Sequence, residues 1–483
     1  MALFNFLKRK TSTPNTTNLA GGTAYTLTPE MELVTFLFTS FVQEQFYRST
    51  NASIEQLRQL LGKVEPEFAA KAAVYVRTTL GMRSISHVLA SELAPYISGV
   101  TWGRAFFNQI VFRPDDMTEI LGYAMQNNPK FKLPNAMRKG FSSAFDRFDT
   151  YQLAKYRSDG KQVKLVDVVN MVRPTPTDRN AVALSDLVKG RLRNTNTWEA
   201  RLTQAGQIAE TAEQKSELKA EVWKDLLQKR QIGYFALLRN LRNIVVQAPE
   251  LTYLASELLT NPMAIKKSLV LPFRFDTAYR EIKQLSDSMA RTIVLAAIEK
   301  ALSISVDNVP IFKGKTLVVL DTSGSMQGKP AQIGGLLAVV VAQSNNADFM
   351  TFSDAARYEQ YNWKNSTLSL VNELKFVWGG TNFDSIFETA KRAYDRIIIL
   401  SDMQAWVGGG APVESFANYC KRTGANPFIY SFDLQGYGSI QFPLDKVFCL
   451  AGFSDKIFDI MSLLETDRNA MVNEIKKISW NKI

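Results

Sequence analysis

Residues 316–326 read TLVVLDTSGSM, and this stretch decides the fold of the C-terminal part of the chain. The first five residues form a β-branched, apolar run with the length of a buried strand, and the polar, glycine-containing run after it must turn sharply. The next apolar stretch, AQIGGLLAVVVAQ over 331–343, has the length of a helix. A strand, a polar loop and a helix in this order indicate a parallel α/β sheet.

The same alternation continues toward the C-terminus. Strands are predicted at 348–352, 396–400, 427–432 and 447–450, and helices near 366–375, 383–394 and 412–423. Strands joined by helical crossovers predict a doubly wound α/β domain over residues 310–483. Ligands of such a sheet bind at the carboxyl ends of its strands, near a switch in strand order.

Oxygen-bearing side chains stand where the predicted strands end. Asp321, Ser323 and Ser325 form an Asp-x-Ser-x-Ser loop, Thr381 lies in GGTNFD before a predicted helix, and Asp402 follows the strand RIIIL. Carboxylate and hydroxyl oxygens suit a divalent cation, most of all Mg²⁺. The alternative is a polar turn that stabilises itself by local side-chain to backbone bonds, and that reading leaves Thr381 and Asp402 unexplained.

A helical pattern fills residues 23–305. SIEQLRQLLGK predicts a helix capped by Ser53, and EPEFAAKAAVYVRTTLG predicts one with Pro66 in its first turn and Gly81 after its end. The stretch 219–244 predicts two helices with a break near Gly233. Successive amphipathic helices must stack to bury their faces, which favours a superhelical array of helix pairs. Residues 1–22, rich in Thr, Asn and Gly, are expected to form a disordered leader.

Positive charge is concentrated in the helical part. The chain of 483 residues carries a net charge of +11. Residues 301–483 hold 17 Lys and Arg against 18 Asp and Glu, which leaves 40 against 28, a net of +12, for residues 1–300. A basic body attracts polyanions by neutralising phosphates and releasing their counterions.

Several function classes are disfavoured by composition. The single histidine, His87, lies in a helical-looking segment, where a packing or RNA-facing role is expected rather than a catalytic one. Two cysteines, Cys420 and Cys449, exclude a disulfide framework and favour a reducing, cytoplasmic compartment. No export signal or membrane-spanning run is expected, and the chain lacks a G-x-x-x-x-G-K-[ST] phosphate loop. An enzyme is therefore not expected.

A dense run of cations lies near two tyrosines, Tyr151 and Tyr156. Lys and Arg can contact phosphates and the rings can stack on unpaired bases, so this run is a candidate RNA surface. The alternative is a solvated helix face. The candidate RNA-binding residues are Arg138, Lys139, Lys155, Arg157, Lys161, Lys164 and Arg173. Weaker candidates are Arg239, Arg242, Lys266 and Lys267.

Longer motifs carry a resemblance to known families. The loop 321–325 with Thr381 and Asp402 resembles the metal-ion-dependent adhesion site of von Willebrand A domains. The segments 153–176, 221–244 and 261–282 look like signature segments of the TROVE module, which occurs in Ro proteins and in telomerase- and vault-associated proteins. A TROVE region followed directly by an A domain resembles the Ro family, over roughly residues 23–480.

The resemblance implies a fold and a function. It implies a ring of HEAT-like helical repeats closed by the A domain, a Y-like small noncoding RNA on the outer basic surface, and single-stranded 3′ ends of misfolded RNA in a central hole. Lys155 and Arg157 match outer-surface contacts of the family, whereas Met171 stands where some relatives have histidine. An exoribonuclease tethered by RNA and an acidic protein ligand at the metal are the implied partners.

Two other functions compete with this one. A metal-dependent adhesion module without an RNA role explains the metal site but not the basic helical body. A two-metal nuclease needs several clustered carboxylates, whereas the predicted site has two carboxylates and three hydroxyls, Asp321, Ser323, Ser325, Thr381 and Asp402.

Overall fold

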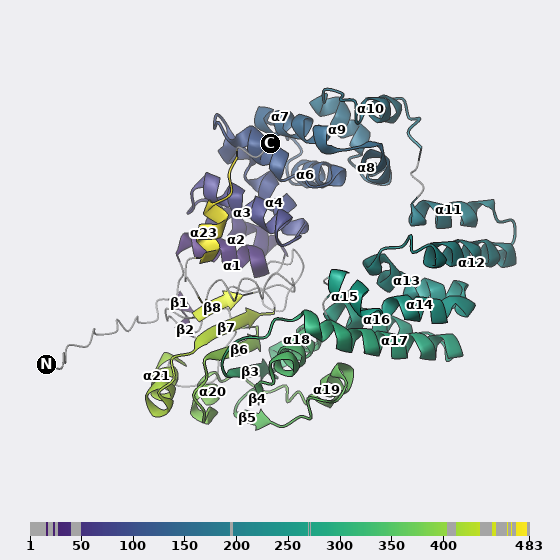
Figure 1. The fold of residues 1–483 in the computed structure, drawn as a ribbon. Coiled ribbons are helices and arrows are strands. Elements are labelled where there is room, and N and C mark those ends of the chain that lie inside the picture. Colours follow the sequence, from purple (N-terminus) through teal and green to yellow (C-terminus); the bar gives the residue numbers. More distant parts are fainter. Residues whose placement is uncertain are drawn as a thin grey trace.

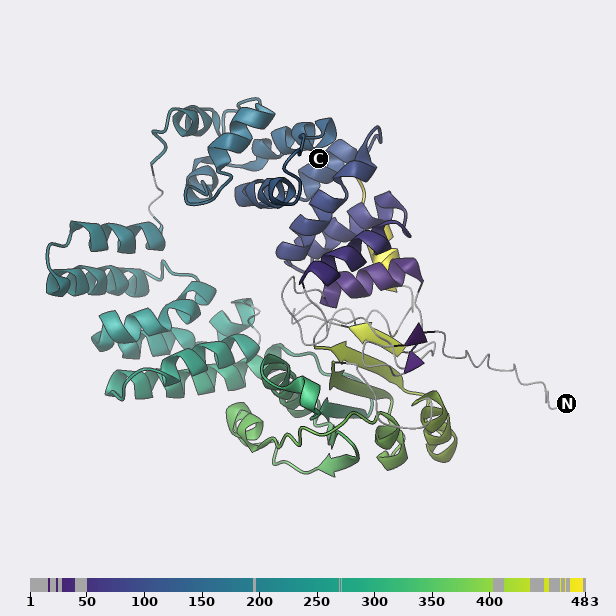
Figure 2. The same cartoon turned by 180° about the vertical axis from the view of Figure 1, so that it is seen from behind.

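The elements of the chain follow one another around a ring, with helices along most of its circumference and a β-sheet along one side (Figure 1). The view from behind shows the same order (Figure 2). The computed structural model describes residues 16–17, 23–24, 28–39, 50–193, 197–268, 270, 272–402, 412–434, 447–450, 461, 465 and 470–480. The predicted fold class, a mainly helical body followed by an α/β sheet, is confirmed.

The first half of the helical body ends at Val188. It consists of α1 (Pro29–Thr39), α2 (Thr50–Leu61), α3 (Pro66–Thr78), α4 (Ser84–Glu92), η1 (Ala94–Ile97), α5 (Gly103–Gln109), α6 (Pro114–Asn127), α7 (Asn135–Ala144), η2 (Phe145–Arg147), α8 (Thr150–Lys155), α9 (Leu165–Val172) and α10 (Ala181–Val188). Two short strands precede it, β1 (Thr16–Thr17) and β2 (Thr23–Ala24), paired antiparallel. Strand β1 falls inside the stretch 1–22 that was expected to be disordered, most of which lies outside the described residues.

Proline and glycine punctuate these helices as predicted, but one cap was assigned wrongly. Pro66 opens α3, and Gly81 follows its end with φ +69°, a backbone conformation that glycine adopts without strain. Ser53 does not cap α2, which begins at Thr50 and carries Ser53 buried within its first turns. The helix starts earlier because TNAS is compatible with helix geometry once the apolar face of α2 packs on the core.

The second half of the body has its own core. It consists of α11 (Trp198–Ile208), α12 (Ala212–Gln228), α13 (Tyr234–Gln247), η3 (Pro249–Leu251), α14 (Thr252–Leu259), α15 (Pro262–Ser268), α16 (Pro272–Lys283), α17 (Met289–Ser305) and η4 (Val306–Asn308). The predicted break near Gly233 is confirmed, because Gly233 stands between α12 and α13. Trp223 anchors this core, fully buried, and Leu368 of the α/β part joins it.

The sheet has the strand order β5-β4-β3-β6-β7-β8, and β4 with β5 is its only antiparallel pair among the described strands. Its strands are β3 (Thr316–Asp321), β4 (Asp348–Phe352), β5 (Ala356–Glu359), β6 (Arg396–Ser401), β7 (Phe428–Asp433) and β8 (Val447–Leu450). Its helical segments are η5 (Gly324–Met326), α18 (Lys329–Asn345), α19 (Thr367–Glu373), α20 (Asp384–Thr389), α21 (Pro412–Thr423) and α23 (Ala470–Lys476). The chain adds β4 on one side of β3 and β6 on the other, so the strand order switches at β3.

Alternate side chains of β3 reach opposite faces of the sheet. Val318 and Leu320 share a core with α18, whereas Leu317 and Val319 share another with α20 and α21. Burial on both faces explains why the strand reads as a continuous apolar run rather than an alternating one.

Helix α20 is shorter than the predicted 383–394. It ends at Thr389, after which the backbone amides of Lys391 and Tyr394 donate to the hydroxyls of Tyr358 and Tyr419, at 3.2 and 3.1 Å. These tertiary hydrogen bonds take the place of the helical ones. Strand β5 was not predicted, since ARYE is short and half polar, as edge strands often are.

The C-terminal segment closes the ring by packing on the first helices (Figure 1). The Trp480 ring stacks on Trp102 with centroids 5.6 Å apart, and its indole N–H donates to Glu67 Oε1 at 2.9 Å. Gln109 of α5 donates to the carbonyl of Ser479 at 3.0 Å. Helix α23 and residues 477–480, here called the C-terminal clasp, therefore join the sheet side of the ring to α3 and α5.

Candidate metal centre and nucleic-acid interface

The first loop of the candidate metal centre is built around Asp321, the last residue of β3. Its carboxylate accepts the backbone N–H of Ser323 at 2.8 Å and the hydroxyl of Ser401 at 2.6 Å. The hydroxyls of Ser323 and Ser325 lie 3.3 Å apart. The structure thus brings together three of the predicted ligands, Asp321, Ser323 and Ser325, at the carboxyl end of the central strand.

A second loop, residues 378–381, is hydrogen-bonded to the first. The amide of Trp378 donates to the carbonyl of Thr322 at 2.8 Å, and the amide of Gly324 donates to the carbonyl of Gly379 at 2.9 Å. The predicted ligand Thr381 stands at the end of this loop with its side chain buried. The two loops therefore lie side by side.

The fifth predicted ligand, Asp402, follows β6 and is fully buried. Its neighbour Ser401 is the residue that hydrogen-bonds Asp321, since β6 pairs with β3 directly. The ends of β3 and β6 therefore bring two carboxylates to the same edge of the sheet.

Burial governs the electrostatics of this centre. Desolvation raises the pKa of Asp321 to about 6, although the hydrogen bonds from Ser323 and Ser401 act in the opposite direction. These two donors are neutral, so they compensate the buried charge only in part. A divalent cation would stabilise the ionised form. The two carboxylates and three hydroxyls are hard oxygen donors, and they fit Mg²⁺.

Sequence reasoning missed two residues of this edge. Asp354, two residues after β4, accepts the amide of Gly380 at 3.1 Å. A Cβ at Gly379 would lie 2.2 Å from Asp354 Oδ2, so a side chain there would displace that carboxylate. Ser401, which hydrogen-bonds Asp321, was also not singled out. The signal was available, since both residues stand at the carboxyl end of a predicted strand.

The candidate RNA-binding residues occupy three successive parts of the first helical half. Arg138 and Lys139 are exposed on α7, and Arg173 is exposed at the end of α9, with φ +49°. The structure gathers the other four between α8 and α9. These are Lys155, Arg157, Lys161 and Lys164.

Lys155 and Arg157 differ in what their charges contact. The Lys155 ammonium lies 5.6 Å from the ring of Tyr151 and 5.9 Å from that of Tyr156, and its nearest carboxylate, on Glu199, is 3.9 Å away. Arg157 is half-buried, pairs with Asp159 at 2.8 Å and donates to the carbonyl of Leu192. Lys155 therefore presents its charge beside two rings, whereas Arg157 holds the chain that leads to α11.

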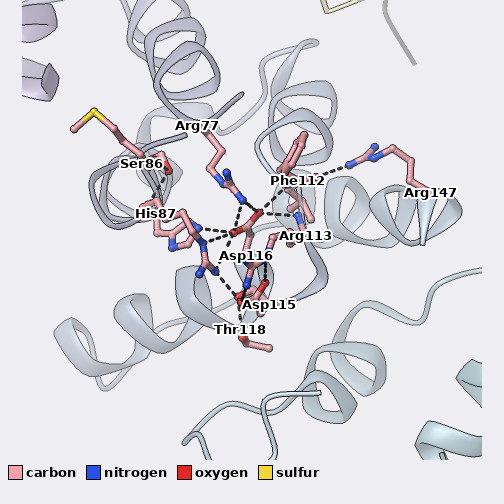
Figure 3. Close-up of polar contacts among 12 residues, drawn as sticks. Arg77, Ser86, His87, Phe112, Arg113, Asp115, Asp116, Thr118 and Arg147 are labelled. Carbon is pink, nitrogen blue, oxygen red and sulfur yellow. Dashed lines mark hydrogen bonds and ion pairs between the residues drawn. The ribbon is translucent and has the colours of Figure 1, made fainter. Parts of the chain in front are cut away.

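A buried polar cluster stands behind this surface, centred on Asp116 in the first turn of α6 (Figure 3). Asp116 accepts bidentate hydrogen bonds from the guanidinium of Arg77 and one hydrogen bond from His87 at 2.9 Å. It also accepts the backbone amides of Phe112 and Arg113 at 2.9 and 2.8 Å. His87 thus has the packing role that was one of its two expected roles.

The Asp116 carboxylate of this cluster is held in its ionised form. Burial raises the pKa of Asp116, but the hydrogen bond from His87 and the charge of Arg77 outweigh it and hold the pKa well below its usual range. The cluster reaches the basic surface through Arg113, whose guanidinium pairs with Asp115 and lies 4.2 Å from the ring centroid of Tyr156. Asp116 holds the backbone of Arg113 and Asp115 holds its guanidinium, which lies over one of the two rings beside Lys155.

Basic side chains line two cavities of the helical body. One of about 780 Å³ lies between α8 and α11 and is lined by Lys155, Tyr156 and Arg201. The other, of about 800 Å³, lies between α13 and α16, and its lining includes the weaker candidates Arg239 and Arg242. The remaining weaker candidates, Lys266 and Lys267, are exposed on α15.

Comparison with known proteins places the helical body in a family. The model of the TROVE domain matches residues 38–218 and 188–294, together more than half of the chain. Telomerase protein component 1 of Rattus norvegicus is 31% identical over 112 residues, which are 22% of this chain and 4% of that protein. The Mus musculus protein of the same name is 23% identical, over 49% of this chain and 12% of its own length. The chain thus spans a small part of these relatives.

The fold of the whole chain also has a solved counterpart. The crystal structure of the Deinococcus radiodurans RO (RSR) protein superposes with a TM-score of 0.62, covering 93% of this chain and 99% of that one, at 17% sequence identity. At that identity the likeness concerns the fold alone. Because the family model covers most of the helical body and the solved Ro fold covers the ring, the chain belongs to the TROVE domain family and has the fold of a Ro protein.

Proposed function

We propose that this chain is an RNA-binding protein of the Ro type. It binds a small, Y-like noncoding RNA on the outer basic surface and single-stranded 3′ ends of misfolded RNA inside the ring, as a step of RNA quality control in the cytoplasm. The observation that carries the proposal is the arrangement at the end of α8, where Lys155 lies against two tyrosine rings, one of them 48% exposed. A cation beside an exposed ring can contact a phosphate while the ring stacks on a base.

The charge distribution supports the same function. The first 300 residues carry the whole positive excess, and the TROVE match lies within them. The function is binding rather than catalysis, and an exoribonuclease tethered by the bound RNA would degrade the misfolded strand. Across the described part of the chain, no helix combines the length and apolarity that a bilayer-spanning segment needs.

Filter binding across a salt series tests the RNA function. A hairpin with a single-stranded 3′ tail is compared with the same hairpin ending bluntly. The tailed RNA should bind more tightly, and its affinity should fall steeply with salt because phosphate contacts release counterions. Equal, weak binding of both hairpins would contradict the proposal and leave only a basic surface.

Substitutions of two exposed lysines test the proposed RNA-binding surface. Lys155→Ala combined with Lys161→Ala should weaken binding of a hairpin RNA and reduce the salt slope by about 2, roughly one for each lost phosphate contact. Lys364→Ala, which removes an exposed lysine of the α/β part, is the matched control and should leave affinity and slope unchanged. An unchanged slope in the double variant would remove these lysines from the RNA site.

We propose further that Asp321, Ser323, Ser325, Thr381 and Asp402 hold Mg²⁺ and leave one position open to an acidic side chain of a protein partner. The neutral donors around the buried Asp321 support this. The isosteric variant Asp321→Asn should lose Mg²⁺ binding in calorimetry and keep its RNA affinity. The exposed Glu373→Gln is the control, and full Mg²⁺ binding by the Asn variant would refute the site.

A further inference from the structure

Three apolar residues without a role so far stand beside the candidate metal loop. They are Phe376, Val377 and Trp378, here called the aromatic lip. Val377 is 53% and Trp378 42% exposed, while the rings of Phe376 and Trp378 stack with centroids 5.0 Å apart and planes 16° from parallel. A tryptophan on a surface offers a large apolar face with few rotatable bonds, as binding sites for proteins often do.

The backbone under Trp378 is strained. Its φ is +59°, in the left-handed region that costs a bulky residue about 1–2 kcal/mol and where glycine would be free of that cost. The strain is maintained by the hydrogen bond from its amide to Thr322, inside the Asp-x-Ser-x-Ser loop. A strained, exposed tryptophan bonded to the candidate metal loop points to a functional requirement for its ring at this place.

The lip also has a rigid foundation. Phe376 and Leu374 pack against α18 at Gly335, where a Cβ would come within 2.8 Å of Leu374 Cδ1 and 3.6 Å of the Phe376 ring. The chain is bound again at Gly379, whose carbonyl accepts the amide of Gly324. The lip is fixed at both ends and therefore preorganised. The protein loses little conformational entropy when a ligand packs on it.

The charges beside the lip favour an anionic ligand. Lys375 is exposed next to Phe376, and α18 begins at Lys329 shortly after Ser325, with the positive end of its dipole toward the loop. Of the exposed carboxylates in this region, Asp354 accepts the amide of Gly380 and Glu373 lies on α19, before Lys375 in the chain. A cation held by Asp321 would add to this positive field.

We propose that the aromatic lip makes the metal centre selective for one kind of peptide. The ligand is a protein segment in which an acidic side chain completes the metal coordination and an adjacent aromatic or large aliphatic residue packs on Trp378. This rests on the metal part of the proposed function and does not depend on RNA binding. Single-stranded RNA is the competing ligand for an exposed ring, but residues 301–483 carry 17 Lys and Arg against 18 Asp and Glu, and this lack of positive excess favours a peptide over a polyanion.

An array of hexapeptides tests the selectivity. Each carries a central Glu followed by one of the other amino acids, with glycines elsewhere, and is probed with the full chain and Mg²⁺. Peptides with Trp, Phe or Leu after Glu should bind about tenfold more tightly than the peptide with Ser, as expected for a well-packed aromatic contact. A flat array would overturn the proposal.

Variants separate the lip from the metal. Trp378→Ala should remove the preference for an aromatic neighbour while binding still requires Mg²⁺, and Trp378→Phe should retain it. Tyr253→Ala, which removes another exposed ring on α14, should behave like the unmodified chain. An unchanged preference in Trp378→Ala overturns the role of the lip.

Two further outcomes have distinct meanings. Selective peptide binding that persists in EDTA and in Asp321→Asn would refute the metal centre and, with it, metal-bridged recognition. Loss of affinity for a single-stranded oligonucleotide in Trp378→Ala, with peptide binding unchanged, would assign the ring to RNA. Fluorescence anisotropy with labelled peptide and labelled oligonucleotide measures both on the same samples.

Discussion

At the scale of single residues, Trp378 shows how a local conformational cost can be measured apart from the side chain that causes it. Alanine and glycine both remove the ring and its stacking on Phe376, but only alanine keeps a Cβ at φ +59°. Trp378→Gly should therefore have a free energy of unfolding about 1 kcal/mol higher than Trp378→Ala. Urea unfolding of both variants measures the difference. If alanine proves equally stable, the backbone there is relaxed in solution.

Asp116 is the fully buried carboxylate at the centre of the polar cluster in the first helical half. Asp116→Asn keeps the shape but leaves the guanidinium of Arg77, 4% exposed, without its counter-charge. Removing one partner of a buried ion pair costs about 3–5 kcal/mol. Urea unfolding should show this loss, while Asp115→Asn, at a half-buried carboxylate, should cost less. A loss equal to that of Asp115→Asn would mean that Arg77 finds another partner.

The same carboxylate makes stability dependent on acid. The pKa of Asp116 is lowered in the folded chain, so its stabilising contribution is complete above the unfolded value of about 4 and is lost as pH falls below it. The difference in unfolding free energy between the unmodified chain and Asp116→Asn should therefore shrink from pH 6 toward pH about 3. A constant difference over that range would contradict the lowered pKa.

At the scale of elements, the sequence predicted what local chemistry decides. The strand at 316–320, the loop after it and the break at Gly233 each depend on residues that leave the backbone few alternatives. The early start of α2 and the early end of α20 could not be predicted, because the core decides the first and the hydroxyls of Tyr358 and Tyr419 the second. The ends of β3 and β6, which carry predicted metal ligands, could be expected to meet because a parallel sheet brings strand ends together. The aromatic lip was not predicted, since strain at Trp378 is visible only in three dimensions.

The C-terminal clasp contacts residues far from it in the sequence, such as Glu67, which precedes Trp480 by 413 positions. Trp480→Ala removes the stack on Trp102 and the hydrogen bond to Glu67, and for a half-buried ring it should cost about 2 kcal/mol, roughly half of the effect at a fully buried site. Thermal unfolding measures it, and limited proteolysis should cut near residue 480 faster. Trp480→Phe should restore most of the stability. Unchanged stability in Trp480→Ala would mean that α23 alone holds the closure.

At the scale of the whole molecule, burial is uneven along the second helical half of the ring. Helix α11, which begins the second core, buries one residue, whereas α17 at its end buries seven. Local opening is easiest where few side chains are buried. Hydrogen exchange followed by mass spectrometry should therefore show α11 exchanging well before α17. Equal protection of both helices would contradict this expectation.

The closure of the ring by the C-terminal clasp also affects how the chain folds during its synthesis on the ribosome. Lys71 of α3 donates to the carbonyl of Lys476, a residue 405 positions later in the chain. At translation rates of about 5–20 residues per second, α3 emerges roughly 20–80 seconds before its partner. During that interval this contact cannot form, and the ring stays open between α3 and the C-terminal clasp. Closure of the ring is therefore a late step of folding, because it joins residues far apart in the chain and such long-range contacts form slowly.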